Sequence, residues 1–124
     1  MKTLKSLLTT LALVAAGFAH AEPYSQEAFD NLLKAGKPTL VEVHADWCPT
    51  CKKQAPITDA LLKLEPYRQI SPLTVDFDTQ KDALKTLRVN KQSTLIVFKN
   101  GKEVGRSLGD TSREGIENLL KKAI

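Results

Sequence analysis

The spacing of hydrophobic residues changes repeatedly along the chain, and these changes predict alternating helices and strands. From Ser25, a residue type that favours helix N-caps, apolar residues recur at helical intervals until Gly36. The segment TLVEVHA at residues 39–45 is instead a mostly apolar run of strand length. Helical spacing returns after the two cysteines that follow, with Pro56 inside the expected helix, where it should cause a kink.

The second half of the chain continues the alternation. Residues 73–77 (LTVDF) and residues 94–98 (TLIVF) are apolar runs of strand length, and a helical spacing begins between them near Thr79. The pair Asn100–Gly101 is a strong signal for a tight hairpin. It leads into a further short strand at residues 103–106, so the last two strands should be antiparallel neighbours.

A final helix is indicated by Thr111 and Glu114, which have the spacing of a capping box ahead of a helical apolar pattern. The expected order is therefore helix, strand, helix, strand, helix, strand, strand, helix. Strands joined through helices usually pair in parallel, whereas the hairpin adds an antiparallel edge strand. The sequence thus predicts an α/β fold with a mixed central β-sheet and helices on both faces.

The N-terminal segment has the pattern of a secretory signal peptide. It opens with two lysines and no acidic residue, continues with an uncharged, mostly apolar run at residues 7–18, and ends in Ala-His-Ala at residue 21. The apolar run is shorter than the roughly 20 residues that a spanning helix needs. We therefore expect residues 1–21 to be a signal peptide. Residues 22–124 should form one periplasmic or secreted domain that does not span the membrane.

Charge gives no sign of a nucleic-acid partner. The chain has 18 basic and 14 acidic residues, and without the two lysines of the N-terminal segment 16 basic residues face 14 acidic ones. The basic residues are scattered singly or in pairs among acidic residues, which does not form the clustered positive surface that nucleic acids require.

Cys48 and Cys51, in the sequence WCPTC, are the only cysteines of the chain and allow three interpretations. A disulfide that closes so short a loop would stabilise the fold by only about 2 kcal/mol, which disfavours a purely structural bond. A structural zinc site needs four ligands. The mature chain offers two cysteines and one histidine, His44. A metal-binding or metal-delivery protein that uses Cys48 and Cys51, with His44 as a further candidate ligand, remains the alternative.

A reactive cysteine pair agrees best with the local pattern. Cys48 should stand at or next to the N-cap of a helix, with Pro49 at the first helical position, where proline is favoured. Unpaired backbone N–H groups and the helix dipole stabilise a thiolate at this end of a helix. Cys51 should be more buried and remain a thiol. Cys48 would then attack a substrate disulfide, and Cys51 would resolve the mixed disulfide.

These motifs together resemble the thioredoxin family over nearly all of the mature chain. The segment LVEVHADWCPTCKKQAP, with Trp47 before the first cysteine and Pro56 after the second, is similar to the family's active-site strand, turn and second helix. STLIVFKNGKEVGRSLGD resembles its β-hairpin, with Gly109 at a family glycine. The resemblance implies a thioredoxin-like fold and thiol–disulfide exchange with protein thiols and disulfides, by a monomer without a cofactor. A reductant of this kind would draw electrons from a membrane thiol carrier.

The resemblance also implies which residues surround the cysteine pair. Trp47, Pro49, Thr50, Ser93 and Thr94 are expected to face the substrate. Two further positions depart from the family pattern. Glu42 stands where the family has a buried aspartate, and it is either a proton shuttle for Cys51 or a strand residue that reaches water. His44 replaces an aromatic residue and could be a charge partner, a ligand or a surface side chain.

Ser93 is the largest departure, because it occupies the position of a family cis-proline. A cis bond before a non-proline residue costs roughly 2.5–4 kcal/mol, so we expect a trans bond at Ser93. Serine should then open the approach to the cysteine sulfurs and permit metal binding. On this basis Ser93→Pro would restrict metal access and leave the dithiol chemistry largely intact.

Overall fold

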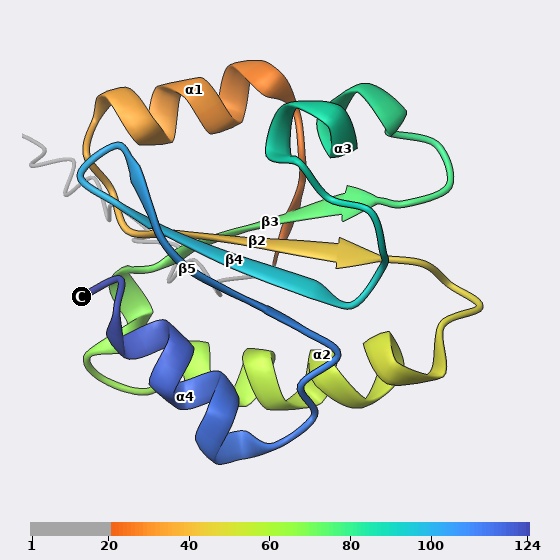
Figure 1. Cartoon of the computed structure of the whole chain (residues 1–124). Helices are drawn as coiled ribbons and strands as arrows, with labels where there is room; N and C mark the ends of the chain where they lie inside the picture. The colour runs from red at the N-terminus through yellow and green to blue at the C-terminus, as the bar shows by residue number, and fades with distance from the viewer. Residues whose placement is uncertain (1–20) are drawn as a thin grey trace, which may run out of the picture.

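The computed structural model describes residues 21–124, and the expected signal peptide lies outside the described residues apart from Ala21. Five strands form one sheet in the order β1-β3-β2-β4-β5, with α1 and α3 on one face and α2 and α4 on the other (Figure 1). The elements are β1 (Glu22–Pro23), α1 (Gln26–Lys34), β2 (Thr39–His44), α2 (Pro49–Leu62), the 3₁₀ helix η1 (Tyr67–Gln69), β3 (Ser71–Asp76), α3 (Lys81–Leu87), β4 (Thr94–Lys99), β5 (Lys102–Leu108) and α4 (Arg113–Lys121). The predicted mixed sheet with helices on both faces is confirmed.

The direction of β4 differs from the sequence prediction. β2 pairs in parallel with β3, but β4 pairs antiparallel with β2 although a helix joins β3 to β4. β3 ends at Asp76 and β4 begins at Thr94, with the short α3 (Lys81–Leu87) between them. The chain does not return to the starting end of β3. β4 instead begins near the carboxyl end of β2, where Leu95 lies opposite Glu42, and so runs in the reverse direction.

Element boundaries follow the hydrophobic pattern with small shifts. β3 begins at Ser71, two residues before the predicted strand, and Phe77 lies outside it. Pro56 lies inside α2, as expected. β1 and η1 were not predicted, because two- and three-residue elements carry no recognisable period.

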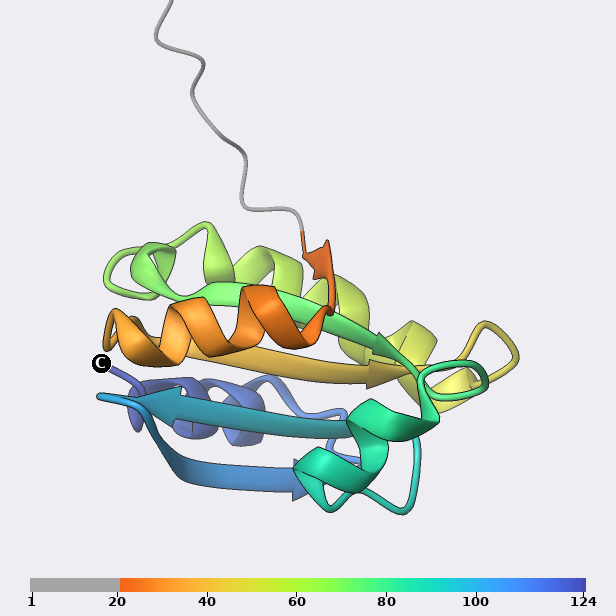
Figure 2. The ribbon, with the colours of Figure 1, turned by 90° about the horizontal axis from the view of Figure 1, so that it is seen from above.

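Two apolar layers hold the helices against the sheet. One layer joins α1 and α3 to the strand residues on their side, and it includes Phe29, Val41 and Ile96. The other joins α2 and α4 to the opposite face, and it includes Leu40, Leu61 and Leu120. Seen from above, α1 runs roughly along the direction of the strands, and α3 lies near the carboxyl end of β3 (Figure 2). No helix between residues 21 and 124 has the length and apolar character that a membrane crossing requires.

The N-cap of α4 is Ser112, not the predicted Thr111. The Ser112 hydroxyl accepts a hydrogen bond from the Gly115 N–H at 3.1 Å, three residues further on. The Asp110 carboxylate in turn accepts bonds from the Ser112 backbone N–H and from its hydroxyl, both at 2.8 Å. The neighbouring aspartate therefore selects between two adjacent hydroxyl residues, and Glu114 lies in the first turn of the helix.

We predict that Ser112→Ala lowers the free energy of unfolding by about 1 kcal/mol, because it removes an N-cap acceptor. Thr111→Ala, one residue earlier, should leave that free energy within about 0.5 kcal/mol of the parent. Urea unfolding of the three proteins measures both effects. A larger loss for Thr111→Ala than for Ser112→Ala would restore the capping box predicted from the sequence.

Candidate active site

Cys48 is the N-cap residue of α2, as the sequence predicts, and Pro49 occupies the first helical position. The Cys48 backbone is extended (φ −83°, ψ 110°), and its sulfur accepts a hydrogen bond from the Cys51 N–H at 3.1 Å. This N–H is one of the donors that a helix leaves unpaired in its first turn. The helix therefore directs a backbone donor and the positive end of its dipole at the Cys48 sulfur.

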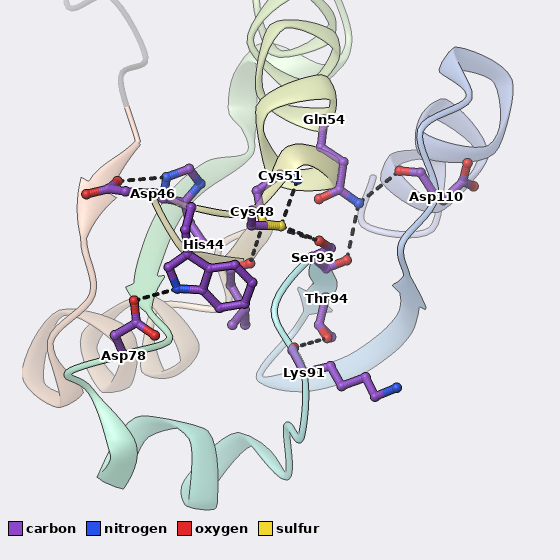
Figure 3. The surroundings of a disulfide bond; sticks show 12 residues. His44, Asp46, Cys48, Cys51, Gln54, Asp78, Lys91, Ser93, Thr94 and Asp110 are labelled. Atoms are coloured by element: carbon purple, nitrogen blue, oxygen red, sulfur yellow. Dashed lines mark hydrogen bonds and ion pairs between the residues drawn. A yellow bond between two sulfur atoms is a disulfide. The ribbon is translucent and has the colours of Figure 1, made fainter.

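Cys48 and Cys51 are joined in a disulfide with their Cα atoms 5.3 Å apart. Both residues are buried, and the expectation that Cys51 would be the more buried of the two is wrong. Cys48 is 1% exposed and Cys51 is 3% exposed. The cover comes partly from the loop before β4, where the Ser93 hydroxyl oxygen lies 3.1 Å from the Cys48 sulfur and 3.2 Å from the Cys51 sulfur (Figure 3).

Ser93 adopts a left-handed backbone conformation with φ of +63°. Its peptide bond is trans, as predicted, because the cis bond among residues 21–124 is Glu65–Pro66. A left-handed conformation costs a residue other than glycine about 1–2 kcal/mol. Hydrogen bonds hold it in place: the Ser93 N–H donates to the Val43 carbonyl at 2.8 Å, and the Ser93 carbonyl accepts from the Gly109 N–H at 2.9 Å.

The expectation that serine opens the approach to the sulfurs is therefore wrong. The left-handed turn brings the Ser93 side chain over the disulfide, and Ser93 itself is buried. Gln54 helps to fix this arrangement, because its side-chain N–H group donates to the carbonyls of Ser93 (3.2 Å) and Asp110 (2.9 Å). Sequence analysis missed Gln54, although a polar residue one turn after Cys51 on the same face of the expected helix was an available signal.

Glu42 lies on β2 and lines a cavity of about 290 Å³ together with Cys51, His44, Gln54 and other residues. The structure therefore brings Glu42 and Cys51 to one cavity. Burial raises the pKa of the Glu42 carboxyl above its ordinary value, and the nearby Asp59 carboxylate raises it further. A hydrogen bond with Thr58 and the charge of His44 act in the opposite direction but do not overcome burial.

His44 does not join the cysteines as a third ligand. Its Nε2 atom lies 3.2 Å from the Asp46 carboxylate, and Figure 3 shows this pair beside the disulfide. In the described part of the chain, no three His, Cys, Asp or Glu side chains gather closely enough to hold a metal ion.

The five residues expected to face the substrate differ in exposure. Trp47 is 56% exposed, and its indole N–H donates to the Asp78 carboxylate at 2.9 Å, a contact that sequence analysis missed. Pro49 is exposed and Thr50 is half-buried. Ser93 and Thr94 are buried, so neither side chain presents an exposed surface in the disulfide form. The Thr94 hydroxyl instead donates to the Lys91 carbonyl at 2.7 Å within the same loop.

Known proteins match this chain over most of its length. Residues 20–122 match the family model of thioredoxin. The thioredoxin of Chlamydia trachomatis is 35% identical over 98 residues, which cover 79% of this chain and 93% of that protein. Trxlp from Edwardsiella tarda, known from a crystal structure, is 46% identical in sequence and has a TM-score of 0.79. The match covers 82% of this chain and 98% of Trxlp. The structure of oxidised thioredoxin from Plasmodium falciparum has a sequence 26% identical to this one and a TM-score of 0.71. The match covers 85% of this chain and 100% of the Plasmodium protein.

We predict that Ser93→Pro lowers the free energy of unfolding by at least about 2 kcal/mol. Proline fixes φ near −65° and has no N–H, so it can neither adopt the turn nor donate to Val43. Ser93→Gly is the matched control, because glycine accepts a positive φ and retains the N–H. Equal urea midpoints for Ser93→Pro and the parent would contradict the geometry of this loop.

The raised pKa of Glu42 predicts how stability depends on pH. The unfolded chain ionises Glu42 near its ordinary pKa of 4.5, whereas the folded protein retains the proton to higher pH. The parent therefore loses stability as pH rises from that value through the native pKa. Glu42→Gln does not ionise, so its stability relative to the parent should increase between pH 4 and pH 8. Urea unfolding at several pH values checks this, with the exposed Glu27→Gln as control. A pH-independent difference would contradict the raised pKa.

Proposed function

The chain belongs to the thioredoxin family, and on that premise we propose that it is an exported oxidoreductase in which Cys48 attacks and Cys51 resolves. Family membership makes the protein a thioredoxin-type thiol–disulfide oxidoreductase with a thioredoxin-like fold, a redox-active cysteine pair and protein thiols or disulfides as substrates. The observation that carries the division of roles is the Cys51 N–H directed at the Cys48 sulfur at 3.1 Å. This donor supports negative charge on Cys48 rather than on Cys51.

The proposed exchange proceeds in two displacements. In the reduced protein, the Cys48 thiolate attacks one sulfur of a substrate disulfide. A Cys48–substrate disulfide forms while the other substrate sulfur leaves as a thiolate. Cys51 then loses its proton and attacks the Cys48 sulfur, which forms the Cys48–Cys51 disulfide and releases the second substrate thiolate. Two electrons pass from the cysteine pair to the substrate, and the reverse sequence oxidises a substrate dithiol.

Glu42 is the proposed acceptor of the Cys51 proton. Both residues line the same cavity of about 290 Å³, which is large enough for water molecules to link them. Because its pKa is raised, the Glu42 carboxylate binds a proton more readily than an exposed carboxylate does, as a general base for Cys51 requires. Glu42→Gln should therefore slow the step that activates Cys51.

Cys48 is 1% exposed in the disulfide form, so a substrate sulfur reaches it only when neighbouring side chains give way. The exposed Trp47 precedes Cys48 and the exposed Pro49 follows it, and these two residues are the proposed first contacts for a substrate protein. The geometry does not favour the metal-binding alternative, because His44 contacts Asp46 and no third His, Cys, Asp or Glu side chain gathers with the cysteines within residues 21–124. A metal held by Cys48 and Cys51 would need ligands from a second molecule.

Export is supported by the sequence alone. Residues 1–21 have the signal-peptide pattern, and the family match begins at residue 20, near the expected cleavage point. A monomeric periplasmic protein that exchanges electrons with a membrane thiol carrier would fit this location.

We predict that Cys48→Ser abolishes exchange, whereas Cys51→Ser accumulates mixed disulfides with substrates. In the reduced parent at mildly acidic pH, iodoacetamide should modify Cys48 before Cys51, because only Cys48 receives the helix N–H. Mass spectrometry of the labelled peptides distinguishes the sites, and the unfolded reduced protein is the control for intrinsic reactivity. Faster labelling of Cys51 would overturn the proposed roles.

Export is tested by expressing the whole chain in a bacterium and separating the periplasm from the cytoplasm. We expect a periplasmic product whose mass corresponds to a chain that starts at Glu22. The same chain without residues 1–21 should remain in the cytoplasm. A full-length, cytoplasmic product from the whole chain would contradict export.

A further inference from the structure

Ser93 contributes a side-chain group that touches both atoms of the redox bond. Its hydroxyl oxygen lies 3.1 Å from the Cys48 sulfur and 3.2 Å from the Cys51 sulfur, as Figure 3 shows. Ser93 lies 45 residues after Cys48 in the sequence. It is therefore not part of the WCPTC segment, and the sheet has to bring it there.

The backbone fixes where the Ser93 hydroxyl points. The Ser93 N–H donates to Val43 at 2.8 Å, and its carbonyl accepts from Gly109 at 2.9 Å and from the Gln54 side chain at 3.2 Å. Ser93 is 3% exposed, so little water competes for the hydroxyl. A donor that is fixed and desolvated before the reaction starts interacts more strongly with a developing charge than a mobile donor does.

The direction of the hydrogen bond follows from the chemistry of sulfur. A disulfide has no S–H group, so the hydroxyl is the donor in the oxidised state. Disulfide sulfur is a weak acceptor, whereas a thiolate carries a full negative charge and accepts a stronger, charge-assisted bond. The same hydroxyl therefore interacts more strongly with the reduced, ionised site than with the oxidised one.

We propose that Ser93 is a catalytic residue of this oxidoreductase, whose hydroxyl donates to whichever cysteine sulfur carries the negative charge during exchange. Before attack it donates to the Cys48 thiolate. When a substrate thiolate attacks the Cys48 sulfur in the reverse direction, the bond between the cysteines breaks and Ser93 donates to the departing Cys51 thiolate. Ser93 retains its own proton throughout, and the electrons move only between sulfur atoms.

This role has a thermodynamic consequence. A group that stabilises the thiolate more than the disulfide stabilises the reduced protein, and this raises the reduction potential. Removal of the hydroxyl should thus make the pair more reducing and the thiolate harder to form. The proposal rests on the family's dithiol chemistry. It does not depend on which cysteine attacks, because Ser93 contacts both sulfurs.

The test compares Ser93→Ala with Ser93→Gly. Both variants remove the hydroxyl and retain the N–H that donates to Val43, but only glycine relieves the left-handed backbone. Ser107→Ala is the control, since the Ser107 hydroxyl is buried and lacks a hydrogen-bond partner in the described structure. Equilibration of each protein with glutathione buffers gives the equilibrium constant, and thiolate absorbance near 240 nm as a function of pH gives the ionisation of the cysteines.

We expect Ser93→Ala and Ser93→Gly to shift the glutathione equilibrium about tenfold toward the disulfide, which corresponds to about 30 mV. Both should also move thiolate formation to higher pH, and Ser107→Ala should do neither. Glycine keeps the test valid if alanine impairs folding. Equilibria and thiolate titrations like those of the parent would overturn the proposal. It would also fail if only one of the two variants shifted, because the backbone rather than the hydroxyl would then be responsible. Iodoacetamide labelling reports separately on the proposed roles of Cys48 and Cys51.

Discussion

The hydrogen bond from the Ser93 N–H to the Val43 carbonyl connects the two parts of the chain that make the site. β2 leads into the cysteine turn at one end of the sheet, and β4 starts beside it because the two central strands are antiparallel. Their ladder ends with Glu42 opposite Leu95. The hydrogen bond from Ser93 to Val43 continues the pairing of the two strands beyond the end of this ladder. It holds the loop before β4 against the disulfide. Without the reversal of β4, the loop and the cysteines would lie at opposite ends of the sheet.

This loop also explains why serine is compatible with the site and proline is not. A backbone φ of +63° is unavailable to proline, whose ring holds φ near −65°. The left-handed turn costs free energy, but it allows the N–H, the carbonyl and the hydroxyl of one residue to be used at the same time. The N–H and the carbonyl fix the loop, and the hydroxyl contacts both sulfurs. The helix supplies a second donor, the Cys51 N–H, to the Cys48 sulfur.

Local signals in the sequence were sufficient to predict the part of the site that lies on β2 and α2. The N-cap position of Cys48, the proline that follows it and the mixed sheet could be predicted because each depends on neighbouring residues or on a regular period. The rest of the site depends on contacts between distant residues. The sign of φ at Ser93, the direction of β4 and the burial of Cys48 are set by tertiary packing, so the sequence pattern suggested an open loop where the structure has a closed one. The same reason explains Ser112, which the Asp110 carboxylate selects over Thr111.

The central claim is that the Cys48–Cys51 bond is a reversible redox couple and not a structural bond. Equilibration of the purified, metal-free parent across a series of glutathione buffers, with both thiols counted by mass after alkylation, tests it most directly. We expect the two thiols to appear together in a single two-electron transition, with a midpoint between about −270 and −120 mV. A disulfide that stays oxidised below about −300 mV, as structural disulfides do, would contradict the account.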